Sequence, residues 1–146
     1  MLVEKLLPRT RKRMQCIELG AALLQAARLL DDGQDMLLVR DEEGRLAGIL
    51  TKTDVVRQIG RCAGASCTAP VAQAMTRDVV SVRPDGWLQE AWEAMKERGF
   101  KNLPITDDAG RPLGVLNARE ALQALLDETR HEEELLRDYV MNVGFH

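Results

Sequence analysis

Serine, histidine and aromatic side chains are scarce in this sequence of 146 residues, and their scarcity argues against most forms of catalysis. Ser66 and Ser81 are the only serines, and neither stands in the G-x-S-x-G pattern of a nucleophilic serine. The sequence also has no P-loop motif for binding phosphates. The two histidines, His131 and His146, both lie close to the C-terminal end. We therefore do not expect the protein to be an enzyme.

Cysteine is also rare, and long apolar runs are absent. Cys16, Cys62 and Cys67 are an odd number without a C-x-x-C pair, so buried thiols are expected rather than disulfides or a metal site. No apolar run approaches the roughly 18 residues that span a membrane, and the charged start lacks the apolar stretch of a signal peptide. A net charge of -3 provides no basic field for nucleic acid. A cytoplasmic protein that binds neither membranes nor nucleic acid is expected.

The strongest positive feature is an internal duplication, in which residues 36–59 match residues 102–125 without a gap. The duplication predicts a first repeat over 1–66, a second repeat over 67–128 and a C-terminal extension over 129–146. Six positions of the matched segments are identical, and in the first copy they are Leu37, Asp41, Gly44, Arg45, Gly48 and Leu50.

Both copies carry the same periodicities. Apolar residues spaced i, i+3, i+4, i+7 predict helices over 20–31 and 88–95, which Gly33 and Gly99 end. An acidic-Gly turn between two short apolar stretches then predicts a β-hairpin, followed by a second helix. Each copy therefore has the order β-α-β-β-α. The predicted strands are 15–19, 36–39 and 46–50 in the first copy and 79–82, 102–105 and 112–116 in the second.

This order leaves one face of each sheet without helices. We therefore predict an α/β (α+β) fold in which the two repeats pack sheet to sheet around a pseudo-two-fold axis. The first helix carries further apolar residues outside its main stripe, and such a helix needs cover on a second side. A homodimer is expected for this reason. The residues outside the stripe are Ala21, Ala22, Leu24 and Leu29.

Two such copies, each with an acidic-Gly turn, an "LL" or "LP" strand start and a closing motif like G-h-h-[ST]-x-x-D, resemble a pair of cystathionine β-synthase (CBS) domains. The resemblance covers residues 1 to 128. It implies a regulatory module that binds AMP, ADP, ATP or a related adenosyl ligand in clefts between the paired repeats. It implies no catalysis and no resident cofactor. An effector protein of unknown identity is expected as the partner, and a ligand-free dimerisation or interaction module is the alternative.

The closing motif has two interpretations. Thr51 and Asp54 fit a capping box at the start of a helix, an arrangement that contributes about 1 kcal/mol in any protein. The resemblance implies instead that Asp54 accepts the ribose hydroxyls and that Thr51 lies beside a phosphate. In the second copy these positions are Asn117 and Glu120, and the longer glutamate keeps the cap but is a poorer ribose clamp. The adjacent Lys52 and Arg119 are candidates for binding phosphate.

Further candidate residues precede the first strand of each copy. The basic run 9–13 includes Lys12 and Arg13, which the resemblance places near a ligand phosphate, although a solvated basic loop is an equal alternative. With 3% aromatic residues, aliphatic side chains are expected to enclose an adenine. Trp92 is interpreted as a packing residue. The remaining predicted site residues are Leu38, Val79, Val80, Asn102 and Pro104.

The C-terminal extension carries apolar residues at helical spacing. We therefore predict a helix that docks against this chain or a second copy. The residues that show this spacing are Leu135, Leu136, Tyr139 and Val140.

Overall fold

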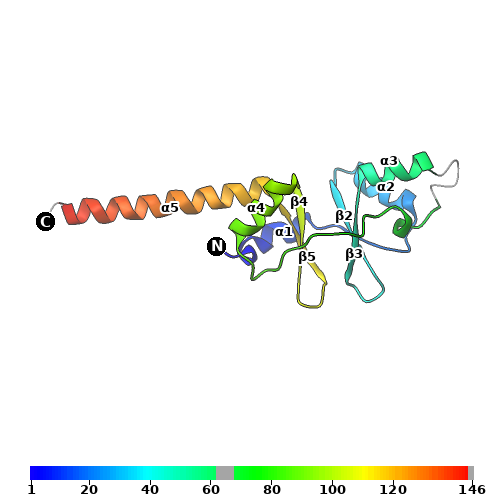
Figure 1. The fold of residues 1–146 in the computed structure, drawn as a ribbon, viewed down its shortest axis with the longest axis horizontal. Coiled ribbons are helices and arrows are strands. Elements are labelled where there is room, and N and C mark those ends of the chain that lie inside the picture. Colours follow the sequence, from blue (N-terminus) through cyan, green and yellow to red (C-terminus); the bar gives the residue numbers. More distant parts are fainter. Residues whose placement is uncertain (62–67, 145–146) are drawn as a thin grey trace.

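The computed structural model describes residues 1–61 and 68–144, which form two small sheets, each with its own helices, and a long C-terminal helix (Figure 1). Cys62, Cys67, Ser66 and His146 lie outside the described residues. The elements up to residue 61 are η1 (Val3–Leu6), α1 (Leu7–Arg13), β1 (Cys16–Glu18), α2 (Leu23–Asp31), β2 (Met36–Arg40), β3 (Leu46–Thr51) and α3 (Lys52–Arg61). Those from residue 68 on are η2 (Val71–Gln73), α4 (Leu88–Arg98), β4 (Asn102–Thr106), β5 (Pro112–Asn117) and α5 (Ala118–Gly144).

Both predicted hairpins are confirmed. β2 pairs antiparallel with β3, and β4 pairs antiparallel with β5 in the equivalent register. Their turns use Gly44 at φ 80° and Gly110 at φ 82°, a backbone region that favours glycine. In each turn an aspartate accepts two backbone N–H bonds; for Asp41 the donors are residues 43 and 45, and these bonds hold the pKa of its carboxyl below the usual range.

The strand predicted over 79–82 is wrong: only Val82 forms a bridge, to Ile105 of β4. In the first repeat, the N–H of Leu38 donates a 2.9 Å bond to the carbonyl of Gln15, next to β1. Pro104 occupies the position of Leu38 in the second repeat and has no N–H to donate. The second sheet therefore has two strands, whereas the first has the order β1-β2-β3.

The segments that lead into the two repeats are exchanged between them. The N–H of Val3 donates to the carbonyl of Gly86, and Val3 and Leu6 belong to the core of the second repeat. Conversely, the N–H of Val71 donates to the carbonyl of Ala21, and Val71 belongs to the core of the first repeat. Each core is thus completed by residues that belong, in sequence, to the other copy.

The two sheets face each other, as predicted. Met36 and Leu38 of β2 form a buried cluster with Val115 of β5, and Ile49 of β3 packs against it. The N–H of Leu46 also donates a 2.8 Å bond to the carbonyl of Gly110. The hairpins therefore lie side by side at the centre of the molecule (Figure 1).

Helix α2 is covered by its own repeat more fully than its sequence predicts. Ala21 and Leu29, which lie outside the main apolar stripe, pack against the core of the first repeat. Ala22 and Leu24 stay exposed. Because the first repeat already covers Ala21 and Leu29, α2 gives less reason to expect a homodimer. The dimer itself remains a prediction.

The basic run 9–13 is helical and not a loop, because it belongs to α1. Thr10 of this helix is buried against Gly114 of β5, where a Cβ would lie 2.6 Å from the threonine hydroxyl. Among the cysteines, only Cys16 is described, and its burial raises the pKa of its thiol, as expected of a structural cysteine.

The extension 129–146 continues α5 without a break to Gly144. The predicted helix is confirmed, but it does not dock on the described part of this chain. Instead the part of α5 beyond residue 128 runs away from both repeats (Figure 1), and the apolar residues of its outer turns are exposed. None of the described helices is long and apolar enough to cross a membrane.

Candidate functional site

The closing motif of the first repeat joins β3 to α3 and forms a complete capping box. The Asp54 carboxylate accepts bonds from the Thr51 N–H at 2.9 Å and from the Thr51 hydroxyl at 3.1 Å. The N–H of Asp54 in turn donates to the Thr51 hydroxyl at 3.4 Å. These reciprocal bonds satisfy backbone N–H groups that the first helical turn leaves free. The capping interpretation of this motif therefore holds in the structure.

The second oxygen of Asp54 faces other partners. Oδ1 accepts a 3.2 Å bond from the hydroxyl of Thr76 and a 3.3 Å bond from the guanidinium of Arg57. Thr76 reaches this position because the backbone of residue 76 pairs with Ile49 of β3. Asp54 is only 5% exposed, so a buried carboxylate lies where the leading segment of the second repeat crosses the first.

The motif of the second repeat forms only half of a capping box. The Asn117 side-chain oxygen accepts bonds from the N–H groups of Arg119 at 3.0 Å and Glu120 at 3.2 Å. Glu120 does not complete the box, because both of its carboxylate oxygens pair with the guanidinium of Arg13, one of them at 2.8 Å. The longer glutamate side chain thus reaches a partner on α1. The prediction that this copy keeps the full cap is wrong in this respect.

The ion pair changes the acidity of Glu120. The hydrogen bond from Arg13 lowers the pKa of the Glu120 carboxyl, and burial opposes this effect only in part. The same hydrogen bond raises the pKa of Arg13 further above its already high value. At neutral pH the pair is therefore fully charged.

A cavity of about 340 Å³ lies beside this ion pair, between α1 and the strands of both repeats. It brings together Lys12, Arg13 and Asn102, three of the predicted site residues. The other lining residues are not marked by any local sequence pattern, because they become neighbours only through the exchanged leading segment. They are Arg9, Gly33, Gln34, Asp35, Met36 and Val115.

The remaining predicted residues are spread around these two motifs. Lys52 and Arg119 are exposed in the first turns of their helices. Val79 and Val80 are half-buried in the segment that follows Thr76. Leu38 and Pro104 are buried and leave little surface for contact with a ligand. Leu38 lies in the cluster between the sheets, and Pro104 lies within β4.

Arg57 also belongs to this candidate site, although it is not among the residues predicted from the sequence. It lies one helical turn after Asp54, a spacing at which oppositely charged side chains meet, so the signal was present. Trp92, by contrast, packs half-buried against the core of the second repeat, with the Lys96 ammonium 4.8 Å from its ring centre.

The Arg13–Glu120 pair predicts a specific dependence of stability on pH. Because the pKa of Glu120 is lowered in the folded state, its contribution is fully present above the ordinary glutamate value of about 4.3. It is lost as the pH falls through the lowered value. Urea unfolding of Glu120→Gln should therefore show a smaller loss of stability than the parent between about pH 6 and about pH 3. Equal losses in both proteins would contradict a stabilising pair.

Comparison with known proteins identifies the two halves of the chain. The model of the CBS domain family matches residues 5–61 and residues 71–127. A 17.7 kDa protein of Acidianus ambivalens is 34% identical over 91 residues, which cover 62% of this chain and 54% of that protein. The chain spans 16% to 36% of the length of four further curated relatives.

Solved structures share the same fold. CBSX2 in complex with AMP superposes with a TM-score of 0.72 at 21% identity, over 88% of this chain and 98% of that chain. The cytosolic domain of the Mg²⁺ channel MgtE in complex with ATP superposes with a TM-score of 0.66 at 24% identity, over 82% and 52%. Since the family model matches most of the sequence, in two equivalent segments, the chain belongs to the CBS domain family and carries a tandem pair of these domains.

Proposed function

We propose that this protein is a regulatory module that binds an adenine nucleotide between its two repeats and transmits the bound state to a partner protein. The observation that carries the proposal is the buried Asp54 carboxylate at the start of α3, where the other repeat crosses it. Relatives of the same fold bind AMP or ATP. The module performs no reaction in this proposal, and its cytoplasmic location is part of it.

Asp54 is suited to a ribose because its present bonds on one side are replaceable. The bonds from Thr76 and Arg57 to Oδ1 are long, at 3.2 and 3.3 Å, and the Arg57 side chain is 53% exposed. Two ribose hydroxyls would donate to this carboxylate with shorter, charge-assisted bonds. Displaced Arg57 and exposed Lys52 would then lie close to the phosphates.

Glu120 is less suited to the same task. Arg13 already occupies both of its oxygens in a bidentate pair, and a ribose would have to break that pair. The cavity beside it offers cationic Arg9 and Lys12, which fit a phosphate better than a ribose. We therefore propose that the nucleotide binds more tightly at Asp54, where displacement of Arg57 would open the site, and more weakly in the cavity beside Glu120.

A ligand-free interaction module is the second candidate. Internal bonds already satisfy Thr51, Asp54 and Asn117 in the structure, which is what a purely structural cap requires. The two functions differ in one measurable respect, because only a ligand that binds the native state raises the melting temperature by mass action.

We expect AMP, ADP or ATP to raise the melting temperature in a panel that also contains NAD and S-adenosylmethionine. At a concentration one hundred times Kd, the stabilisation is about 2.7 kcal/mol. Adenosine should stabilise the protein less than AMP, because it lacks the phosphate, and added salt should reduce the AMP effect. Equal shifts with adenosine and AMP would contradict the phosphate contacts. No shift with any compound of the panel would favour the interaction module.

A further inference from the structure

The N-terminal helix presents a row of cations that have no partner in the structure. Lys5, Arg9 and Lys12 are spaced i, i+4, i+7 along η1 and α1, so they lie on one face of the helix, and all three are exposed. Thr10 is buried on another face. Within the part of the chain that the structure describes, none of the three side chains has a hydrogen bond or an ion pair. We call these three residues the cationic row.

The cationic row lines two neighbouring cavities. The cavity of about 340 Å³ beside the Arg13–Glu120 pair contains both Arg9 and Lys12. A second cavity, of about 350 Å³, contains Lys5 and Arg9 and has residues of α5 on its other side. Arg9 is thus common to both cavities. The row therefore faces a continuous hollow surface about 10 Å long, from residue 5 to residue 12 at a rise of about 1.5 Å per residue.

The charges of the row are not balanced within its own helix. Like charges three or four residues apart destabilise a helix by about 0.2–0.5 kcal/mol per pair. Residues 1–13 contain five Lys or Arg side chains and a single carboxylate, Glu4, whereas the whole protein has a net charge of -3. The row is therefore a positive region on an acidic protein. An anionic group bound along it would relieve the repulsion.

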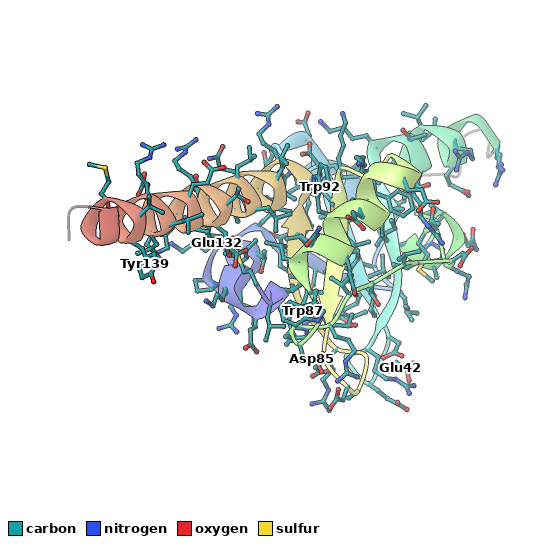
Figure 2. All side chains as sticks on the ribbon, turned by 60° about the vertical axis from the view of Figure 1, so that its left-hand side comes forward. Glu42, Asp85, Trp87, Trp92, Glu132 and Tyr139 are labelled. Atoms are coloured by element: carbon teal, nitrogen blue, oxygen red, sulfur yellow. The ribbon has the colours of Figure 1, made fainter. Side chains whose placement is uncertain are left out.

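Carboxylates lie at both ends of the cationic row. Asp127 and Glu128 of α5 line the cavity that contains Lys5. Figure 2 shows Glu132, one helical turn further along α5, projecting toward the blue N-terminal helix. At the other end, Asp35 lines the cavity that contains Lys12. A long polyanion would extend from the row onto these carboxylates and be repelled, so a short anionic segment fits the row better.

We propose that the cationic row binds a short acidic segment of the effector protein, and that the phosphate of a nucleotide in the adjoining cavity competes with this segment for Arg9 and Lys12. This inference rests on the proposed function, because it names the chemistry of the partner and the way in which the partner senses the ligand. Four extended residues span about 13 Å, so the carboxylates of such a segment can reach the whole row. Since the segment and the phosphate share two cations, each weakens the binding of the other.

An acidic peptide fits the row better than a nucleic acid does. Proteins that bind single strands combine cations with aromatic side chains on which the bases stack. Among the described residues, none of those that line the two cavities is aromatic. Carboxylates need only the ion pairs and hydrogen bonds that lysine and arginine supply.

The first test is the fluorescence anisotropy of a labelled peptide of about six glutamates, measured without nucleotide at about 0.1 M salt, where exposed charges more than about 10 Å apart are largely screened. Lys5→Glu should weaken peptide binding by about three- to tenfold, because it removes one exposed ion pair and adds a repulsion. Arg11→Glu is the matched control. It makes the same change of charge on the same helix, but Arg11 lines neither cavity, so binding should change by less than about twofold.

Equal losses in Lys5→Glu and Arg11→Glu would show only a general attraction to a basic segment and would overturn the proposal. A parent protein that does not bind the peptide would overturn it as well. A thymidine oligonucleotide of about the same length that binds more tightly than the peptide, and loses this binding in Lys5→Glu, would assign the row to nucleic acid instead.

The second test adds AMP or adenosine to the peptide complex. AMP at concentrations that fill the cavity should weaken peptide binding severalfold, and adenosine should not, because it has no phosphate. Lys5→Glu should bind AMP like the parent, since Lys5 does not line that cavity. Peptide binding that AMP leaves unchanged would overturn the competition. A protein that binds the peptide but no nucleotide would contradict the proposed function and leave the docking surface standing, whereas one that binds AMP but no peptide would contradict only this inference.

Discussion

Asp54→Ala is expected to weaken nucleotide binding by roughly ten- to a hundredfold. A hydrogen bond to a charged group contributes about 1.5–3 kcal/mol, and the variant removes the carboxylate proposed to hold the ribose. Titration calorimetry with AMP measures the loss directly. Asp54→Asn should also weaken binding while it keeps the volume of the side chain.

The matched control is Glu120→Ala at the equivalent position of the second repeat. It should change the tighter binding little, because Arg13 already engages both oxygens of Glu120. Binding that survives Asp54→Ala and disappears in Glu120→Ala would reverse the assignment of the two clefts. If neither variant affects binding, the two motifs act only as helix caps.

Stability without ligand must be measured in both variants. Asp54→Ala removes the acceptor of bonds from Thr51, Thr76 and Arg57, whereas Glu120→Ala removes the partner of Arg13. We expect Asp54→Ala to lose more stability than Glu120→Ala. Asp54 is only 5% exposed, and its removal leaves the groups that donate to it without an acceptor. Glu120→Asp separates the ion-pairing role of this carboxylate from a ribose-binding role. The shorter side chain should pair less well with Arg13 and leave the carboxylate available to a ribose.

Gly48→Ala is expected to destabilise the first repeat strongly. A Cβ at this position would lie 2.6 Å from the Thr76 carbonyl oxygen and 2.9 Å from the Met75 sulfur. The backbone of residue 76 pairs with β3 and has little freedom to move away. Overpacking of this kind costs about 1–3 kcal/mol, which lowers the melting temperature by roughly 4–10 °C.

Gly60→Ala provides the matched control for that substitution. Gly60 lies within α3 and has no atom within 4 Å of the position of a Cβ. Alanine is favoured over glycine in a helix by up to about 1 kcal/mol, so this variant should unfold at the same or a higher temperature. A Gly48→Ala variant as stable as Gly60→Ala would show that the leading segment does not press on β3.

Local pattern in the sequence was sufficient for most of the elements. The hairpins around Gly44 and Gly110 depend on neighbouring residues alone, since an acidic residue and a glycine set the turn and the apolar stretches set the strands. The duplication then indicated two equivalent units with one bare sheet face each. Their face-to-face packing follows because each exposed apolar sheet has to be buried.

The failed predictions involve contacts between distant segments. The strand over 79–82 is missing because Pro104 cannot donate the bond that Leu38 donates. An alignment of the two copies already places Pro104 opposite Leu38. Only the register of β1 against β2, however, shows that the N–H of Leu38 donates to the carbonyl of Gln15. The capping prediction for Glu120 failed because Arg13 lies 107 residues away in sequence.

The sequence by itself determined that this chain has two CBS-like repeats, and it identified Thr51 and Asp54 as the motif with the most suitable chemistry. Only the tertiary structure decided which residues share a site with that motif. Each leading segment crosses to the other repeat, which brings Thr76 to Asp54 and Arg13 to Glu120. Periodicity reports how a segment meets its own neighbours, whereas the burial of Val3 and Val71 in the opposite cores depends on how the whole chain packs.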